Sequence, residues 1–243
     1  MSMAASDRDQ MIDVRRAGQR FHTDLGWLDS WHSFSFGPHY DPDNTHHGLL
    51  LVLNDDIVAP GSGFGTHPHR DMEIVTWVLE GSLEHRDSEG NHGVLEPGLA
   101  QRMSAGRGIR HSEMNPSPTT PVRLVQMWVL PDTPGIDPGY EQRWVGDALA
   151  GGGLVPVASG RGHEGAITIH QRDAVCWVGR LAAGTTVPIP DAPSVHVYLA
   201  RGDADLDGAG RLAEGDAARL TAAGSPGLTA GDDGAEVIVW ETA

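Results

Sequence analysis

Residues 65–81 read GTHPHRDMEIVTWVLEG and join two histidines to a run of β-forming residues. In an extended chain, side chains two positions apart point to the same face, so His67 and His69 would lie together on one side of a strand. The run from Ile74 to Leu79 is apolar apart from one threonine, which is typical of a strand that is buried on both faces. The segment therefore predicts β-structure that carries a pair of imidazoles.

Runs of similar character recur between turn-forming residues, which is the pattern of an all-β sandwich or barrel. Glycine occurs 32 times and proline 16 times, without the repetition of a low-complexity sequence. No long stretch has helical periodicity, and a short helix is expected only at 139–145 or 147–150. The other candidate strands are GLLLVLNDD (48–56), GSLEHRDSEGN (81–91), VRLVQMWVL (122–130), AVCWVGRL (174–181), VHVYLARG (195–202) and EVIVWE (236–241).

Composition restricts the classes of function open to the chain. The formal net charge is -16 over 243 residues and no lysine occurs, so direct binding to nucleic acid is not expected. The N-terminus lacks the apolar core of a signal peptide, and no apolar run is long enough to cross a bilayer, which favours a cytoplasmic protein without membrane association. Cys176 is the single cysteine, so no intrachain disulfide can form, and we expect it to be a small buried hydrophobe.

The two halves of the chain show a weak internal similarity. A glycine-rich connection, AGGGLVPVASGRGHEG (150–165), suggests a division into residues 1–146 and 147–243. When the halves are aligned, Val187 and Ile189 stand opposite His67 and His69, and Leu228 and Ala230 stand opposite His111 and Glu113. Because ten of the 13 histidines precede residue 122, we assign any metal chemistry to the first half.

His111 and Glu113 form a second pair with the same spacing, in SAGRGIRHSEMN (104–115). If both segments are strands of one barrel, His67, His69, His111 and Glu113 could converge on a single metal ion. Three neutral imidazoles and a carboxylate suit Fe(II), Mn, Co, Ni or Cu with coordination positions left open, whereas structural zinc favours closed sites with thiolates. Glycines precede each pair (61, 63 and 65; 106 and 108) and could form turns that bring the backbone close to the site.

Neighbouring polar and aromatic residues have simpler interpretations. Glu73 could replace Glu113 as a ligand, orient a histidine, or be a buried structural acid, and we favour the last two. Of the tryptophans expected in the core (27, 31, 77 and 128), Trp77 alone shares the strand parity of the histidine pair and could line a pocket. Among other histidines, His85 and His92 flank the turn-like RDSEGN and are expected in solvent, His46 and His47 in a polar loop, and His32 and His39 in aromatic packing.

These segments resemble the pirin family of the cupin superfamily. The resemblance covers residues 20–145 and is carried by FHTDLGWLDSWHSFSF (21–36), NDDIVAPGSGFGTHPHRDMEIVTWVLEG (54–81), the SAGRGIRHSE segment and PGYEQRW (138–144). It implies an all-β bicupin, with two stacked β-barrels (jelly rolls of the RmlC-like cupin type) and metal in the first barrel alone. It also implies ligation by His67, His69, His111 and Glu113, most often of Fe(II), with Mn, Co, Ni, Cu or Zn as other metals.

The same resemblance implies a function. Some pirins are similar to quercetin 2,3-dioxygenases, so we expect a metal-dependent enzyme that cleaves a small planar aromatic substrate, a flavonol, with O2 and releases carbon monoxide. Glu113 would take the proton of the substrate hydroxyl. The alternative is a non-enzymatic, iron-binding regulator whose redox state alters its affinity for a protein partner. Family members are often monomeric, and a monomer is expected here.

Overall fold

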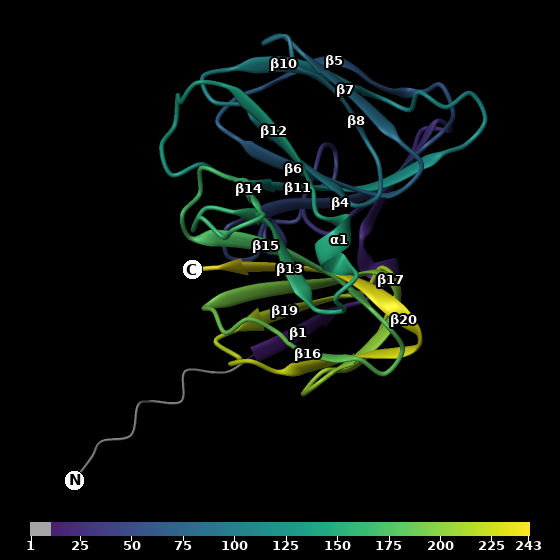
Figure 1. Ribbon diagram of the computed structural model, residues 1–243, viewed down its shortest axis with the longest axis vertical. Coiled ribbons are helices and arrows are strands. Elements are labelled where there is room, and N and C mark those ends of the chain that lie inside the picture. The colour runs from purple at the N-terminus through teal and green to yellow at the C-terminus, as the bar shows by residue number, and fades with distance from the viewer. Residues whose placement is uncertain (1–10) are drawn as a thin grey trace.

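The computed structural model describes residues 11–243, which form two β-rich units stacked along the long axis of the molecule (Figure 1). The all-β expectation is confirmed. In this part of the chain the helical segments are η1 (Ala17–Gln19) and α1 (Gly146–Leu149). Of the two places where a helix was expected (139–145 and 147–150), the first instead contains a strand, in which residues 139–144 pair with residues 99–104. No helix in the described range has the length and apolar character needed to span a membrane.

The first unit contains two sheets that face each other. The larger has the strand order β12-β9-β6-β11-β4-β3-β2, and the smaller has the order β5-β10-β7-β8. The larger sheet consists of β2 (Phe21–Asp24), β3 (Leu28–His32), β4 (Leu50–Val58), β6 (Glu73–Glu80), β9 (Leu99–Ser104), β11 (Val122–Val129) and β12 (Gly139–Trp144). The smaller consists of β5 (Gly63–His69), β7 (Leu83–Asp87), β8 (His92–Leu95) and β10 (Ile109–Met114).

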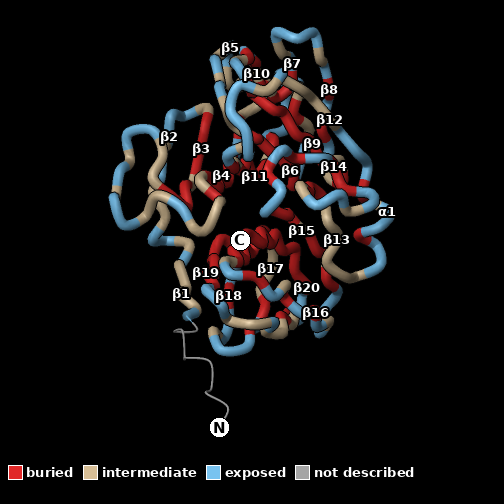
Figure 2. The backbone as a smooth tube through the Cα atoms, turned by 90° about the vertical axis from the view of Figure 1, so that its left-hand side faces the viewer, coloured by how far each residue is buried: buried red, intermediate tan, exposed pale blue. Residues whose placement is uncertain are grey.

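β6 is buried along nearly its whole length because it is covered on both faces. Ile74 and Val78 point into clusters within the first unit, whereas Val75, Trp77 and Leu79 join a cluster shared with the second unit. This explains why the strand reads as a continuous apolar run rather than as an alternation of apolar and polar residues. In Figure 2 the strands along this junction are largely coloured as buried.

The second unit is built on one large sheet with the path β1-β19-β17-β20-β15-β13-β14, to which β16 and β18 are attached. Its first strand comes from the opposite end of the chain: β1 (Met11–Arg15) pairs antiparallel with β19. A division at residue 146 did not anticipate this, and residues 1–10 lie outside the described range. The remaining strands are β13 (Leu154–Ser159), β14 (Ile167–Thr168), β15 (Ala174–Leu181), β16 (Thr186–Pro188), β17 (Ser194–Leu206), β18 (Gly210–Ala213), β19 (Ala217–Thr221) and β20 (Gly227–Thr242).

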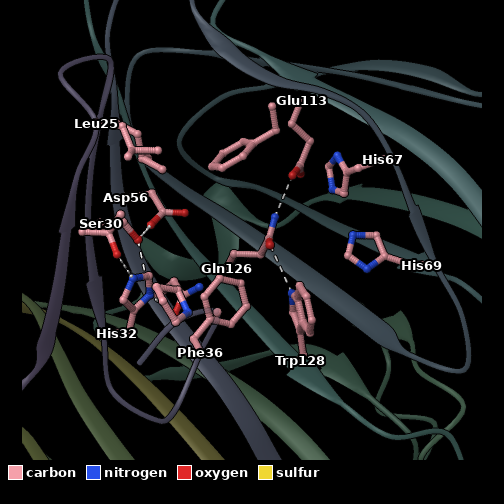
Figure 3. Close-up of a pocket in the computed structure, with 16 residues that line it drawn as sticks. Leu25, Ser30, His32, Phe36, Asp56, His67, His69, Glu113, Gln126 and Trp128 are labelled. Atoms are coloured by element: carbon pink, nitrogen blue, oxygen red, sulfur yellow. Dashed lines mark hydrogen bonds between the residues drawn. The ribbon is translucent and has the colours of Figure 1, made fainter. Parts of the chain in front are cut away.

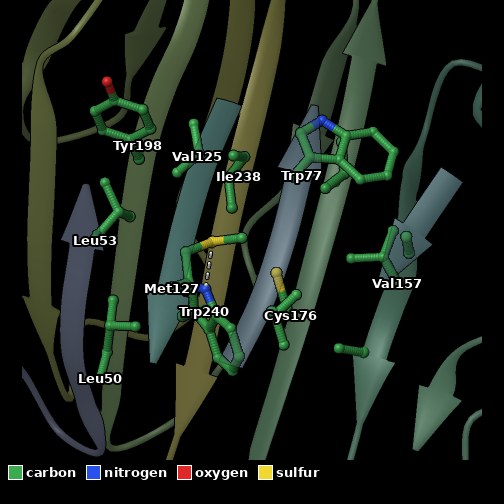
Figure 4. Packing of buried hydrophobic residues seen from close by; sticks show 14 of the residues in the cluster. Leu50, Leu53, Trp77, Val125, Met127, Val157, Cys176, Tyr198, Ile238 and Trp240 are labelled. Atoms are coloured by element: carbon green, nitrogen blue, oxygen red, sulfur yellow. Dashed lines mark hydrogen bonds between the residues drawn. The ribbon is translucent and has the colours of Figure 1, made fainter. Parts of the chain in front are cut away.

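The main hydrophobic core lies between the two units (Figure 4). Trp77 is 1% exposed there, and its Nε1 donates a 2.8 Å hydrogen bond to Glu236 of the second unit. The expectation that Trp77 lines a pocket is therefore wrong. Asp71 has a φ of 47°, so the chain leaves the extended conformation between β5 and β6 and the parity of the histidines does not carry over. Cys176 is fully buried in this core, as expected, and burial raises the pKa of its thiol.

The internal similarity has a structural counterpart in strand register. His67 of β5 pairs with His111 of β10 in the first unit. Val187 of β16 pairs with Leu228 of β20 in the second. The alignment of the halves had placed these same apolar residues opposite the two histidines. The second unit therefore presents a fully apolar pair where the first presents imidazoles.

Candidate metal centre and pocket

Three adjacent strands of the smaller sheet carry the candidate metal centre. β10 lies between β5 and β7, and the register between β10 and β5 shifts between His111 and Glu113. Such an irregularity re-aims the side chains that follow it. Glycine is required next to it, because a Cβ on Gly63 would lie 2.2 Å from the main-chain oxygen of Glu113. Close approach of the two backbones thus explains one of the glycines that precede the histidine pair.

His67, His69 and His111 come together, with nitrogen atoms that lie within 4.8 Å of one another. The ring centroids of His67 and His111 are 4.4 Å apart. Nδ1 of His67 donates to the main-chain oxygen of Gly65 at 2.8 Å. In the singly protonated ring this leaves the lone pair on Nε2. Burial, followed by the neighbouring histidines, lowers the pKa of His69 to about 4 and that of His111 to about 2. His69 and His111 are therefore neutral at physiological pH, the form that binds metals.

Glu113 lies on the same sheet and is 2% exposed. Its Oε2 accepts a 2.8 Å hydrogen bond from Nε2 of Gln126, and the Oε1 of Gln126 accepts one from Trp128 (Figure 3). Burial raises the pKa of Glu113 to about 7, against the lowering effect of the Gln126 hydrogen bond. An oxygen of this carboxylate forms a second cluster of possible ligands with nitrogens of His85 and His111. His111 therefore belongs both to this cluster and to the one with His67 and His69.

Two buried atoms at this centre have no hydrogen-bond partner among the described residues: Nε2 of His111 and Oε1 of Glu113. Buried polar atoms without a partner are rare, because removing them from water is unfavourable unless another group replaces the lost hydrogen bonds. Both atoms can act as electron-pair donors. The centre thus has the chemistry of a cation-binding site.

His85 does not lie in solvent, so that expectation is wrong. It is fully buried, its Nε2 lies 3.2 Å from Oδ2 of Asp87, and its ring stacks on Tyr140 with a centroid distance of 4.8 Å. The strand β7 continues through Asp87, so the turn is shorter than the polar sequence suggested. His92 is exposed, as expected, and contacts Glu84 on the outer face. His85 and Asp87 are two residues apart, as are His67 and His69, and His111 and Glu113. This spacing is the sequence signal that could have identified His85.

A cavity of about 300 Å³ opens beside the cluster, a size suited to a small organic ligand. His67, His69 and Glu113 lie at one end of it, as Figure 3 shows. Much of the remaining wall is apolar, formed by Leu25, Leu28, Phe36, Phe64 and Trp128. Trp128, and not Trp77, is the tryptophan that faces this space.

A polar strip forms the opposite wall of the cavity, and sequence reasoning missed its role. His32 was expected in packing and does stack on Phe36, but its Nδ1 also lies 2.9 Å from Oδ1 of Asn54. Ser30 donates a hydrogen bond to Asp56, which is 3% exposed. Burial raises the pKa of Asp56 to about 7. This strip lies across the cavity from the histidine cluster (Figure 3).

Glu73 lies outside the cluster and serves the junction of the two units. Its Oε2 accepts hydrogen bonds from Ser104 at 3.0 Å and from the main-chain nitrogen of His170 at 2.9 Å. It therefore acts as a buried structural acid, one of the two roles that we favoured. His46 is exposed, but His47 is partly buried, and its Nε2 lies 3.1 Å from the main-chain oxygen of Leu220. Both histidines lie in the loop between β3 and β4, as expected, but His47 also contacts the second unit.

Within residues 11–243 there are two stacked barrels, of which only the first carries the histidine cluster, and this arrangement defines a protein of the bicupin class. Comparison with known proteins is more specific: the chain belongs to the pirin family. The Pirin family profile matches residues 13–129, and a profile described as the quercetinase C-terminal cupin domain matches residues 156–241.

Individual relatives agree with this assignment. A protein of Mycobacterium tuberculosis strain H37Rv, provisionally named a quercetin 2,3-dioxygenase, is 57% identical over 95% of this chain and 94% of its own. Quercetin 2,3-dioxygenase of Escherichia coli K12 is 52% identical over 66% of this chain and 68% of its own. The crystal structure of the bacterial pirin YhhW from Escherichia coli, in complex with nickel(II), has a TM-score of 0.88 and 38% identity, and the match covers 96% of this chain and 99% of that one.

Proposed function

We propose that the first barrel binds one divalent metal ion through His67, His69, His111 and Glu113. The observation that carries this proposal is the pair of buried, unpartnered donor atoms on His111 and Glu113, beside the imidazoles of His67 and His69. Three imidazoles and one carboxylate can hold Fe(II), the metal that the family resemblance most often implies, and Mn, Co, Ni, Cu or Zn can use the same donors. The nickel complex of YhhW supports a metal at a pirin site.

We further propose that the protein is a dioxygenase that cleaves a flavonol such as quercetin. In this reaction both atoms of O2 enter the products, two carbon–carbon bonds of the central ring break, and one ring carbon leaves as carbon monoxide. The names of the relatives support this substrate class. The cavity supports it too, because it is largely apolar, closes around a ligand of limited size and ends at the histidine cluster.

The chain's own residues have separable roles in this proposal. The bound metal would supply Lewis acidity that lowers the pKa of the substrate hydroxyl, together with a route for electrons to O2. Glu113 receives the hydroxyl proton, while the hydrogen bond from Gln126 to its Oε2 fixes the carboxylate and leaves Oε1 free. Phe36, Phe64 and Trp128 hold a flat aromatic ring and exclude water from it.

The test is aerobic incubation of iron-loaded protein with quercetin, following loss of the flavonol absorption band and release of carbon monoxide. We expect one carbon monoxide for each quercetin consumed. His67→Ala should lose metal and turnover together. His92→Ala, which removes an exposed histidine of the first unit, should retain both. Fully iron-loaded wild-type protein that leaves quercetin unchanged would overturn the assignment of substrate. Full activity of metal-free His67→Ala would overturn the assignment of the metal.

A further inference from the structure

Asp87 is held more rigidly than a residue at a hairpin tip requires. Its Oδ1 accepts hydrogen bonds from the main-chain nitrogens of Glu89 at 3.0 Å and Asn91 at 2.9 Å. The side-chain amide of Asn91 donates to both oxygens, at 3.2 and 3.0 Å. A carboxylate that receives this many donors is ionised and can only accept hydrogen bonds. Its remaining contact is with His85.

That contact fixes the tautomer of His85. Because Oδ2 of Asp87 can only accept, Nε2 of His85 must carry the proton across the 3.2 Å that separate them. A neutral imidazole has one N–H, so Nδ1 of His85 presents a lone pair. The ring cannot rotate freely, since it is fully buried and stacked on Tyr140 at an angle of 29°.

The lone pair of His85 in turn fixes the tautomer of His111. The two Nδ1 atoms lie 3.4 Å apart, and one of them must donate for the contact to be favourable. Since Nδ1 of His85 is the acceptor, Nδ1 of His111 carries the proton and Nε2 of His111 bears the free lone pair. Nε2 is also the His111 nitrogen that lacks a partner among residues 11–243. The free lone pair and the position without a partner thus fall on the same atom.

We propose that Asp87 and His85 form a positioning relay, which holds His111 in the Nδ1–H tautomer and so directs its Nε2 lone pair to the metal. Neither residue needs to touch the metal or the substrate. Register supports the arrangement: on neighbouring strands, Asp87 pairs with His111 and His85 with Glu113, so both members of the relay lie beside a ligand of the proposed centre. Carboxylate groups that orient metal-bound histidines typically change metal affinity by about 10–100-fold. This inference rests on the metal site of the proposed function and not on its substrate.

The direct test is nuclear magnetic resonance of the metal-free protein with 15N-labelled histidine, in which long-range 1H–15N correlations distinguish the two tautomers. We expect His111 to be protonated at Nδ1 and His85 at Nε2. Asp87→Asn should reverse the relay, because an amide can donate to Nε2 of His85, which then carries its proton at Nδ1 and donates to His111. His111 should accordingly switch to the Nε2–H tautomer.

Metal affinity gives a second readout that does not depend on catalysis. Titration of metal-free protein with zinc, which is diamagnetic and redox-inert, should show affinity about 10–100-fold weaker for Asp87→Asn than for wild type. His85→Phe should behave alike, because it keeps the stacking on Tyr140 but removes both hydrogen bonds. The matched control is Glu84→Gln, the same carboxylate-to-amide change on the outer face of the same strand.

Each outcome decides the proposal. His111 protonated at Nε2 in the wild-type protein overturns it, whether or not the variants fold. Unchanged zinc affinity and an unchanged His111 tautomer in folded Asp87→Asn also overturn it. A protein that shows the expected tautomers and zinc affinities but fails to oxidise quercetin would refute the proposed reaction and leave the relay standing.

Discussion

His67 and His111 are direct cross-strand partners, with ring centroids 4.4 Å apart on the inner side of one sheet. Their counterparts in the second unit, Val187 and Leu228, form the same kind of pair with apolar side chains. The replacement of two imidazoles by apolar side chains at this paired position is therefore one of the differences between the barrel that carries the histidine cluster and the barrel that does not. This relationship leads to the first of four predictions.

His111→Leu should make the first barrel resemble the second. We expect the variant to bind no stoichiometric metal and to keep its fold, because leucine fills the site and removes the unpartnered Nε2. Its melting temperature should no longer respond to added Fe(II) or Ni(II), whereas that of wild type should rise. Elemental analysis and thermal unfolding with and without metal provide the measurement. Stoichiometric metal in His111→Leu would contradict the proposed ligand set.

Glu113→Gln tests the proposed base at a residue that is also a proposed ligand, so turnover has to be compared per bound metal. The amide can still pair with Gln126, so the fold should survive, but the group that accepts the substrate proton is lost. Turnover per bound metal should fall by about 10²–10⁴-fold, the usual contribution of a general base. The measurement is quercetin oxidation normalised to metal content, with Glu84→Gln as the control on the outer face. Unchanged turnover per metal would remove Glu113 from the reaction.

Asp56 should make stability depend on pH. Burial raises the pKa of Asp56 from 3.8 to about 7, so between these values the folded protein retains a proton that the unfolded chain has released. Stability from this group is therefore greatest at low pH and falls through that window as pH rises, by about 1.4 kcal/mol per pH unit. Asp56→Asn mimics the protonated acid and should remove this slope. Urea unfolding of both proteins at intervals from pH 4 to 8 tests it; parallel profiles would contradict the shift.

Two tryptophans should affect different properties when each is changed to phenylalanine. Trp77→Phe removes a hydrogen bond to Glu236 and leaves a gap in the core between the units, so the free energy of unfolding should fall by about 2–4 kcal/mol. Its KM for quercetin should not change. Trp128→Phe should mainly raise KM, because Trp128 lines the cavity. Unfolding and steady-state kinetics on the pair provide the measurement, and a KM effect confined to Trp77→Phe would reverse their assigned places.

Much of the fold could be predicted because β-structure has a short and strict period. Alternation by two was sufficient to put His67 and His69 on one face, and His111 and Glu113 on one face, before any pairing was known. The alignment of the two halves, which sets Val187 opposite His67, depended only on turns that recur at similar spacing in each half. These properties depend on residues that are close together in the chain, so they can be predicted from the sequence.

The errors share a different cause, since each depends on contacts between residues that are distant in the chain. His85 is buried because Tyr140 of β12 covers it, although the residues around it read as an exposed turn. Trp77 faces the second unit because the chain turns at Asp71, where a positive φ interrupts the alternation. The polar strip that contains Asp56 was not predicted, because the sequence Asn54-Asp55-Asp56 does not indicate which side of β4 faces the cavity.

The pairing of β1 with β19 has a consequence for how the protein is made. Residues 11–15 are synthesised well before residues 217–221, so β1 has to wait for the intervening segment of the chain before its partner strand exists. Once β19 has been made and until β1 pairs with it, β19 has one unpaired edge, open to a strand from another nascent copy. A fragment cut at residue 147 would carry that bare edge permanently, which makes the two halves poor candidates for separate expression despite their matching architecture.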